Sequence, residues 1–324
     1  MDLFITTFES VAVLLGIGLI GFWIIKRKLV PGNILGLLSP LALDIALPCL
    51  IFVNLINNFK PQENPNWWQL PLWWGFFTVI ALALTFLFTL ISKKKTRREF
   101  AVSLFYQNAI FFPLAIFAGL FGDESIYISL LFIFTIFYAA LFFSTYFLFF
   151  EKKQKNLINW KKIIHPVVIA TIIALIIRLS EIQNNVPNLL MRIFELLGGM
   201  TIPLIMIILG GNIYVDFQKK GKIQTFEITK FVLVKNVLFP LIFLGIILLF
   251  KPVLSYPVAL IIILQSAVPP ITAVPLVIER VGGDRAIVNQ FIVVSFIFSL
   301  ISIPTMIYLL DIFFKIIHFQ NNII

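Results

Sequence analysis

Long apolar runs separated by short polar connectors fill the chain from its first residues almost to its end. A helix needs about 20 mostly apolar residues to cross a bilayer, because each residue adds about 1.5 Å to its length. The pattern therefore predicts ten transmembrane helices. Their approximate bounds are 9–25, 34–56, 70–91, 100–121, 126–150, 163–179, 189–214, 231–250, 256–278 and 287–314.

The composition is typical of a protein built into a membrane. Hydrophobic residues make up 60% of the 324 residues and charged residues 12%, whereas soluble domains average about 45–50% and about 25%. This excludes a water-soluble globule and favours an all-α polytopic membrane protein in contact with the lipid bilayer. The single cysteine, Cys49, lies in an apolar run, so there is no disulfide framework and no thiol metal site. We expect no metal and no cofactor.

The basic residues indicate the orientation in the membrane. The formal net charge is +10, but these residues gather in connectors between apolar runs, so nucleic acid is not an expected partner. The connectors after helices 1, 3, 5, 7 and 9 hold 18 of the 25 lysines and arginines. Short connectors rich in Lys and Arg stay in the cytoplasm. We therefore expect a multi-pass protein of the cell membrane (plasma or inner membrane) with both termini outside.

Two halves of the chain resemble each other. Gln107-Asn108-Ala109 matches Gln265-Ser266-Ala267 at an offset of 158 residues, and Gly122-Asp123 matches Gly283-Asp284 at 161. Five predicted helices separate the members of each pair, and an odd number inverts the second copy in the membrane. The pattern predicts a 5+5 inverted repeat, with a first repeat at 1–150, a cytoplasmic linker at 151–162 and an inverted second repeat at 163–324.

Prolines follow the matching polar residues in predicted helices four and nine. They are Pro113 in one and Pro269 and Pro270 in the other. Proline removes a helix hydrogen bond, and an unpaired backbone group in hydrocarbon costs several kcal/mol. Inverted repeats with broken helices are typical of secondary transporters with a midplane site. Two half-helix N-termini would attract an anion there without any buried lysine or arginine. The alternative is that the prolines only kink packed helices.

Two ionisable residues lie inside predicted helices. Asp44 is near the middle of helix two with no basic residue within a turn, where a charge costs at least about 2.5 kcal/mol. Two readings stay open: a group that couples transport to a proton or cation, and an aspartate that stabilises the fold. Lys235, one turn into helix eight, is expected to be structural and to extend its stem to the headgroups.

Three segments resemble the auxin efflux carrier family of permeases, and the resemblance extends over essentially the whole chain. They are Gly16 to Arg27, Asp44 to Phe52, and Gln265 to Asp284. The short linker at 151–162 favours a prokaryotic type over the plant members, which carry a long central loop.

The resemblance implies crossing helices four and nine and a homodimer. It also implies a scaffold of helices 1, 2, 6 and 7, a moving unit of helices 3–5 and 8–10, and small organic anions such as malate, malonate or indole acetate as substrates. Asn108 matches a family asparagine that contacts the substrate carboxylate, and Ser266 stands at its counterpart in helix nine.

An intramembrane enzyme would need a nucleophile with its base, paired acids or metal ligands. His165 and His318 lie outside the predicted helix centres, and Asp123 and Asp284 fall on opposite faces. The sequence therefore argues against an enzyme. It also lacks a nucleotide-binding motif, so a gradient would supply the driving force.

Other classes remain as alternatives. A channel or a membrane receptor fits ten helices, although filter rings and a large soluble domain are not evident. A sodium-coupled organic-anion symporter of the bile-acid symporter type is the nearer one, but helix nine has no acidic residue before Glu279. We expect a permease that moves a small organic anion by alternating access. The expected substrate-binding residues are Gln107, Asn108, Pro113, Gln265, Ser266, Pro269 and Pro270, with Asp44 as the coupling candidate.

Overall fold

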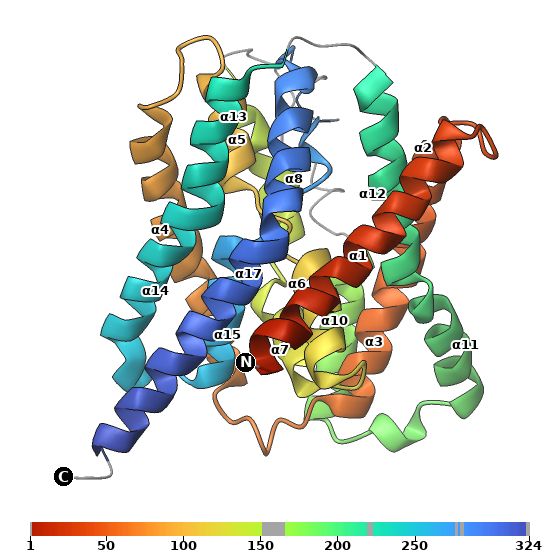
Figure 1. Ribbon diagram of the computed structural model, residues 1–324. Coiled ribbons are helices and arrows are strands. Elements are labelled where there is room, and N and C mark those ends of the chain that lie inside the picture. Colours follow the sequence, from red (N-terminus) through yellow and green to blue (C-terminus); the bar gives the residue numbers. More distant parts are fainter. Residues whose placement is uncertain (1, 151–165, 219–222, 276–277, 279–281, 322–324) are drawn as a thin grey trace. The chain divides into compact units, whose positions relative to one another are not determined.

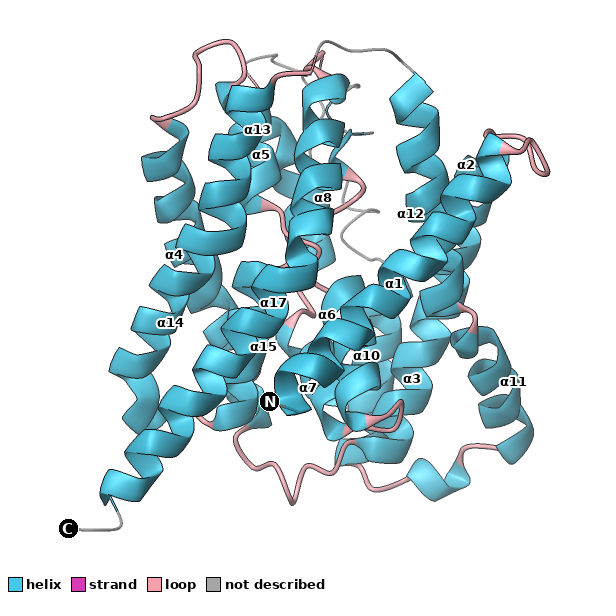
Figure 2. Cartoon of the chain, in the orientation of Figure 1, coloured by secondary structure: helices cyan, strands magenta, loops and turns pink. Residues whose placement is uncertain are grey.

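The computed structural model describes residues 2–150, 166–218, 223–275, 278 and 282–321. Figure 2 shows this part of the chain as helices joined by loops, without a strand. The predicted linker at 151–162 lies outside the described residues. The α-helices are α1 (Asp2–Lys26), α2 (Ile34–Pro40), α3 (Leu47–Asn58), α4 (Leu70–Thr89), α5 (Arg97–Phe105), α6 (Phe111–Phe121), α7 (Ile126–Phe134), α8 (Tyr138–Thr145), α10 (Pro166–Leu179), α11 (Asn188–Gly199), α12 (Thr201–Gln218), α13 (Thr225–Leu233), α14 (Phe239–Phe250), α15 (Tyr256–Ala267) and α17 (Arg285–Asn321).

The helices overlap the predicted apolar runs, although α1 begins at Asp2 and α13 at Thr225, before the predicted starts at 9 and 231. Six helical segments in the described residues are long and apolar enough to cross a membrane: Leu3–Lys26, Ile34–Asn58, Trp67–Thr89, Asn188–Val215, Thr225–Val253 and Arg285–Phe314. Four shorter apolar segments accompany them: Phe111–Phe121, Ile126–Phe142, Pro166–Leu179 and Tyr256–Ala267. An all-helical fold with candidate membrane spans is confirmed for the described residues, whereas the count of ten spans stays a prediction.

Two long helices contain a π-helical segment just before a proline. These are η1 (Leu41–Ala46), followed by Pro48, and η5 (Val234–Leu238), followed by Pro240. Proline has no N–H for the preceding turn, and a π-bulge inserts one extra residue where the regular bonding is interrupted. Each π-helical segment therefore changes the direction in which the neighbouring side chains point, relative to a regular α-helix.

Backbone contacts divide the chain into two units. Unit 1 comprises Met1–Ala12, Gly75–Leu120 and Gly221–Ile324, and unit 2 comprises Val13–Trp74 and Phe121–Lys220. The predicted fifth helix therefore joins the first, second, sixth and seventh in unit 2. This differs from the grouping implied by the family resemblance, because α7 packs against α3.

Unit 1 is built around α14, α15 and α17, which pack against one another (Figure 1). Phe100 of α5 meets Phe231 of α13 and Phe291 of α17 edge to face, at centroid distances of 5.2 and 5.8 Å. Aromatic pairs of this kind add about 0.5–1.5 kcal/mol beyond the area that they bury. These contacts hold α5 in the core of the unit.

In unit 2, α3 packs against α10 and α11, and glycines bring α1 close to α12. A Cβ at Gly210 would overlap the carbonyl of Gly18, and one at Gly21 would overlap the backbone of Ile207. Small residues allow two membrane helices to approach backbone to backbone, where van der Waals packing replaces the hydrophobic effect.

Candidate functional site

Two helix breaks lie within unit 1. The first separates α5, which ends at Phe105, from α6, which begins at Phe111. The second follows the end of α15 at Ala267 and contains Pro269 and Pro270. The prediction that the fourth and ninth helices are broken is therefore confirmed at these positions.

The two breaks satisfy each other's backbone groups. The N–H of Asn108 donates to the carbonyl of Pro269 over 2.8 Å, and the N–H of Ile271 donates to the carbonyl of Tyr106 over 2.9 Å. Gln107 and Pro270 face each other in this short antiparallel bridge. Each break thus gives one donor and one acceptor to the other, which removes the main cost of interrupting a helix away from water.

Glutamine side chains complete the crossing. Nε2 of Gln265 donates to the carbonyl of Ala109 over 2.7 Å, and Nε2 of Gln107 donates to Oε1 of Gln265 over 3.3 Å. Both glutamines are buried. The structure therefore brings together Gln107, Asn108 and Gln265, three of the polar residues that the sequence pattern selected in predicted helices four and nine.

The side-chain oxygen of Asn108, Oδ1, has no hydrogen-bond partner inside the crossing among the described residues. Asn108 is 1% exposed. A buried amide without its full set of partners costs about 1–3 kcal/mol. Because an amide presents either its oxygen or its two N–H donors after a half turn, Asn108 is equipped to bind a polar ligand.

The prolines occupy different places in the two breaks. Pro269 and Pro270 lie inside the non-helical stretch after α15. Pro113 lies in the first turn of α6, where a missing N–H costs little. The first break accordingly precedes Pro113 and covers Tyr106–Ile110.

Ser266 does not occupy the place of Asn108. Asn108 follows the end of α5, whereas Ser266 is still within α15 and its Oγ donates to the carbonyl of Ile263 over 2.7 Å. The two matching triplets are therefore shifted by about one turn relative to the helix ends. Asn108 lies three residues beyond the end of α5, and the residue three beyond the end of α15 is Pro270. The carbonyl that accepts the N–H of Asn108 also belongs to a proline, Pro269.

Lys235 lies beside the second break, where the sequence did not lead us to expect it. It was expected to reach the headgroups, but it is 1% exposed and its Nζ donates to the carbonyl of Ser266 over 3.3 Å. Nζ also lies 5.3 Å from the ring centroid of Phe239. The expectation that Lys235 extends to the headgroups is therefore wrong.

The start of the helix explains this difference. Predicted helix eight begins at 231, which places Lys235 one turn from its start, whereas α13 begins at Thr225 and the helical segment continues to Val253. Lys235, in η5, therefore lies nearly three turns from the start of this segment. A lysine one turn from a helix start can extend its stem to the headgroups, whereas one nearly three turns away is too far from them.

Asp44 lies in unit 2. It stands in η1, its side chain is exposed, and η1 packs with α10, α11 and α12. π-Bulges are frequent at functional sites. A coupling role for Asp44 stays a prediction.

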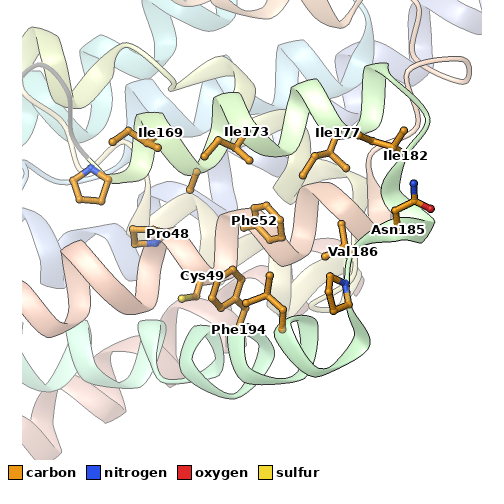
Figure 3. A pocket seen from close by; sticks show the side chains of 14 residues that line it. Pro48, Cys49, Phe52, Ile169, Ile173, Ile177, Ile182, Asn185, Val186 and Phe194 are labelled. Atoms are coloured by element: carbon orange, nitrogen blue, oxygen red, sulfur yellow. The ribbon is translucent and has the colours of Figure 1, made fainter.

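Unit 2 also contains an apolar cavity of about 630 Å³. Figure 3 shows Ile169, Ile173 and Ile177 along α10 facing Phe52 of α3 and Phe194 of α11. This lining offers almost no hydrogen-bond donors, so the cavity suits an apolar group and not a carboxylate. It contains none of the predicted site residues.

Glu227 and the donors around it link two segments of unit 1. Glu227 is fully buried and accepts hydrogen bonds from Ser92 Oγ (2.9 Å), the Lys93 N–H (3.2 Å), Thr96 Oγ1 (3.1 Å) and Lys230 Nζ (3.1 Å). This carboxylate joins α13 to the connector between α4 and α5.

Comparisons with known proteins give one family. A family model described as a membrane transport protein matches residues 6–307. No curated protein matches the chain.

Proposed function

Since the chain belongs to the membrane transport protein family of the auxin efflux carriers, we propose that it is a secondary transporter for a small organic anion. The proposed substrate is a carboxylate, and the proposed mechanism is alternating access across the cell membrane. This function needs no enzymatic chemistry, and we propose that the chain has none.

The crossing of the two breaks carries this proposal. A carboxylate requires hydrogen-bond donors and a positive potential. The amide of Asn108 supplies donors, and the first N–H groups of α6, close behind it in sequence, have no partners within their helix and carry a partial positive charge. Lys235, when it is protonated, adds a positive charge beside α15. A binding site for an anion needs these donors and this positive potential, whereas a site for a neutral or cationic substrate does not.

The proposed architecture is a 5+5 inverted repeat of ten spans with both termini outside. The reciprocal bonding of the breaks supports it, because each break plays the same part toward the other. The alternation of basic connectors supports the orientation. A homodimer is part of the proposal on the strength of the family resemblance.

The test is uptake of labelled malate, malonate and indole acetate into proteoliposomes. We expect saturable uptake of at least one acid by the wild type. Asn108→Ala removes donors to a charged ligand, worth about 1.5–3 kcal/mol, so its apparent affinity should fall about 10–100-fold. Asn57→Ala, at an exposed position near the end of α3, is the matched control and should leave uptake unchanged.

Three results would contradict the proposal or part of it. Folded wild-type protein that takes up none of these acids would remove the substrate class and favour a channel or a receptor. Equal uptake by wild type and Asn108→Ala would move the binding site away from the crossing. Uptake driven by a sodium gradient would favour a symporter of the bile-acid symporter type.

A further inference from the structure

Lys235 is buried inside unit 1, and the proposed anion site offers its charge a partner only while an anion is bound. No acidic side chain forms an ion pair with it among the residues that the structure describes. Its contacts there are the carbonyl of Ser266 at 3.3 Å and the ring of Phe239. Burying an ammonium costs several kcal/mol, so this position indicates a use for the charge.

Nζ of Lys235 lies at the C-terminal end of a broken helix. The last carbonyls of a helix lack partners within it and carry a partial negative charge. At the end of α15, the carbonyl of Leu264 accepts the N–H of Val268 over 3.0 Å, and the carbonyl of Ser266 accepts Nζ. In transporters with discontinuous helices, carbonyls in this position coordinate the coupling cation.

We propose that Lys235 takes the place of a coupling sodium ion, so that this carrier works without sodium and exchanges the proton of Lys235 instead. The proposal rests on the proposed function of anion transport. The ammonium balances the anion while both are held in the protein. Nζ then releases its proton to water on the side where the anion leaves, and takes one from water on the loading side, so one proton accompanies each anion.

Other charged groups near η5 do not replace Lys235 in this role. The segment packs against α13, α14, α15 and α17. α14 carries no titratable side chain. The titratable side chains that the structure describes on the other three helices are Glu227 and Lys230 on α13, Tyr256 on α15, and Arg285, Tyr308 and Asp311 on α17, and none of them has a described contact with Nζ. Lys315 and His318 on α17 are titratable too, and their side chains lie outside the described part of the structure. Glu227 is engaged by Ser92, Lys93, Thr96 and Lys230.

A lysine that only stabilised the end of α15 would give a different result from a lysine that exchanges its proton. Arginine keeps the positive charge and the donors but does not lose its proton in proteins. Lys235→Arg therefore retains the positive charge and removes the proton exchange. Lys235→Met keeps the approximate length of the side chain and removes both the charge and the proton exchange.

The experiment measures initial uptake into proteoliposomes with sodium or choline as the external cation, with and without an inward proton gradient. For the wild type we expect equal rates in sodium and choline, and a several-fold increase with the proton gradient. Lys235→Arg and Lys235→Met should both lose this increase. The matched control is Lys251→Met, because Nζ of Lys251 also donates to helix carbonyls, those of Phe313 and Phe314, and lies over the ring of Phe314. It should keep the increase.

Sodium-driven uptake by the wild type, or a proton response that persists in folded Lys235→Met, would overturn the proposal. If no acid is transported, the proposed function fails first, and a second measurement decides the place of Lys235. The thermal unfolding temperature of the wild type in detergent is compared in sodium chloride and choline chloride. Equal temperatures support a site already filled by Lys235, whereas a sodium-specific rise of several degrees shows a separate sodium site and overturns the proposal.

Discussion

The backbone N–H of Asn108 donates to the carbonyl of Pro269 over 2.8 Å, and this bond joins two helix breaks from opposite halves of the chain. Its partner bond runs from the N–H of Ile271 to the carbonyl of Tyr106. Ile271→Pro deletes that donor and leaves a buried carbonyl unpaired, at a cost of about 1–3 kcal/mol. We expect a lower thermal unfolding temperature in detergent. Ile271→Val keeps the N–H, and an equal decrease in both variants would show that the side chain and not the bond matters.

Glu227→Gln should destabilise the protein. The amide loses the charge that strengthens four hydrogen bonds, and in either orientation its N–H₂ group meets a donor: those on the connector between α4 and α5, or Nζ of Lys230. Charge-assisted bonds are worth about 1.5–3 kcal/mol each, so we expect a loss of at least about 2 kcal/mol in reversible unfolding. Glu63→Gln is the control, since the Lys60–Glu63 pair is exposed and such pairs contribute at most about 1 kcal/mol.

Asp44→Asn tests coupling in unit 2. The variant keeps the size of the side chain and removes its charge and its exchangeable proton. If Asp44 couples transport to a proton or cation, the uptake rate and its dependence on external pH will both change. An unchanged rate with an unchanged pH profile would leave Asp44 with a structural role, and thermal unfolding of the same variant would then measure that role.

Gly210→Val should separate α1 from α12 in unit 2. The added side chain would overlap the backbone of Gly18, which is not a flexible group that moves aside. Poor packing costs about 1–3 kcal/mol or more, so we expect lower yield of folded protein and a lower unfolding temperature. A Cβ at Gly245 meets no atom within 4 Å, so Gly245→Val should fold normally. Similar behaviour of the two variants would contradict close packing at Gly210.

The helices could be predicted from the sequence because apolar runs of membrane length leave little choice of structure. The crossing could be predicted in outline from the prolines and the amides near them. The residues at which the two helices end could not be predicted. The triplets that contain Asn108 and Ser266 look alike in sequence, but Asn108 follows the end of α5, whereas Ser266 precedes the end of α15. Helix ends are set by tertiary bonds, here those between the two breaks.

The position of Lys235 could not be predicted because the start of its helix could not. The apolar run begins at 231, whereas α13 begins at Thr225 with polar and charged residues that the run excludes. The cluster around Glu227 was missed because its partners come from residues 92–96, far away in the sequence. These contacts between distant segments are what allow the charged first turns of α13 to be helical and buried.

The reciprocal bonds between the breaks also restrict how this part of the protein can move. Neither stretch can straighten into a continuous helix without leaving an N–H and a carbonyl of the other in a dry interior, at several kcal/mol for each group. These bonds therefore hold α5, α6 and α15 together as one rigid unit. A substrate bound at the crossing would move across the membrane together with this unit, without a change in the shape of the breaks.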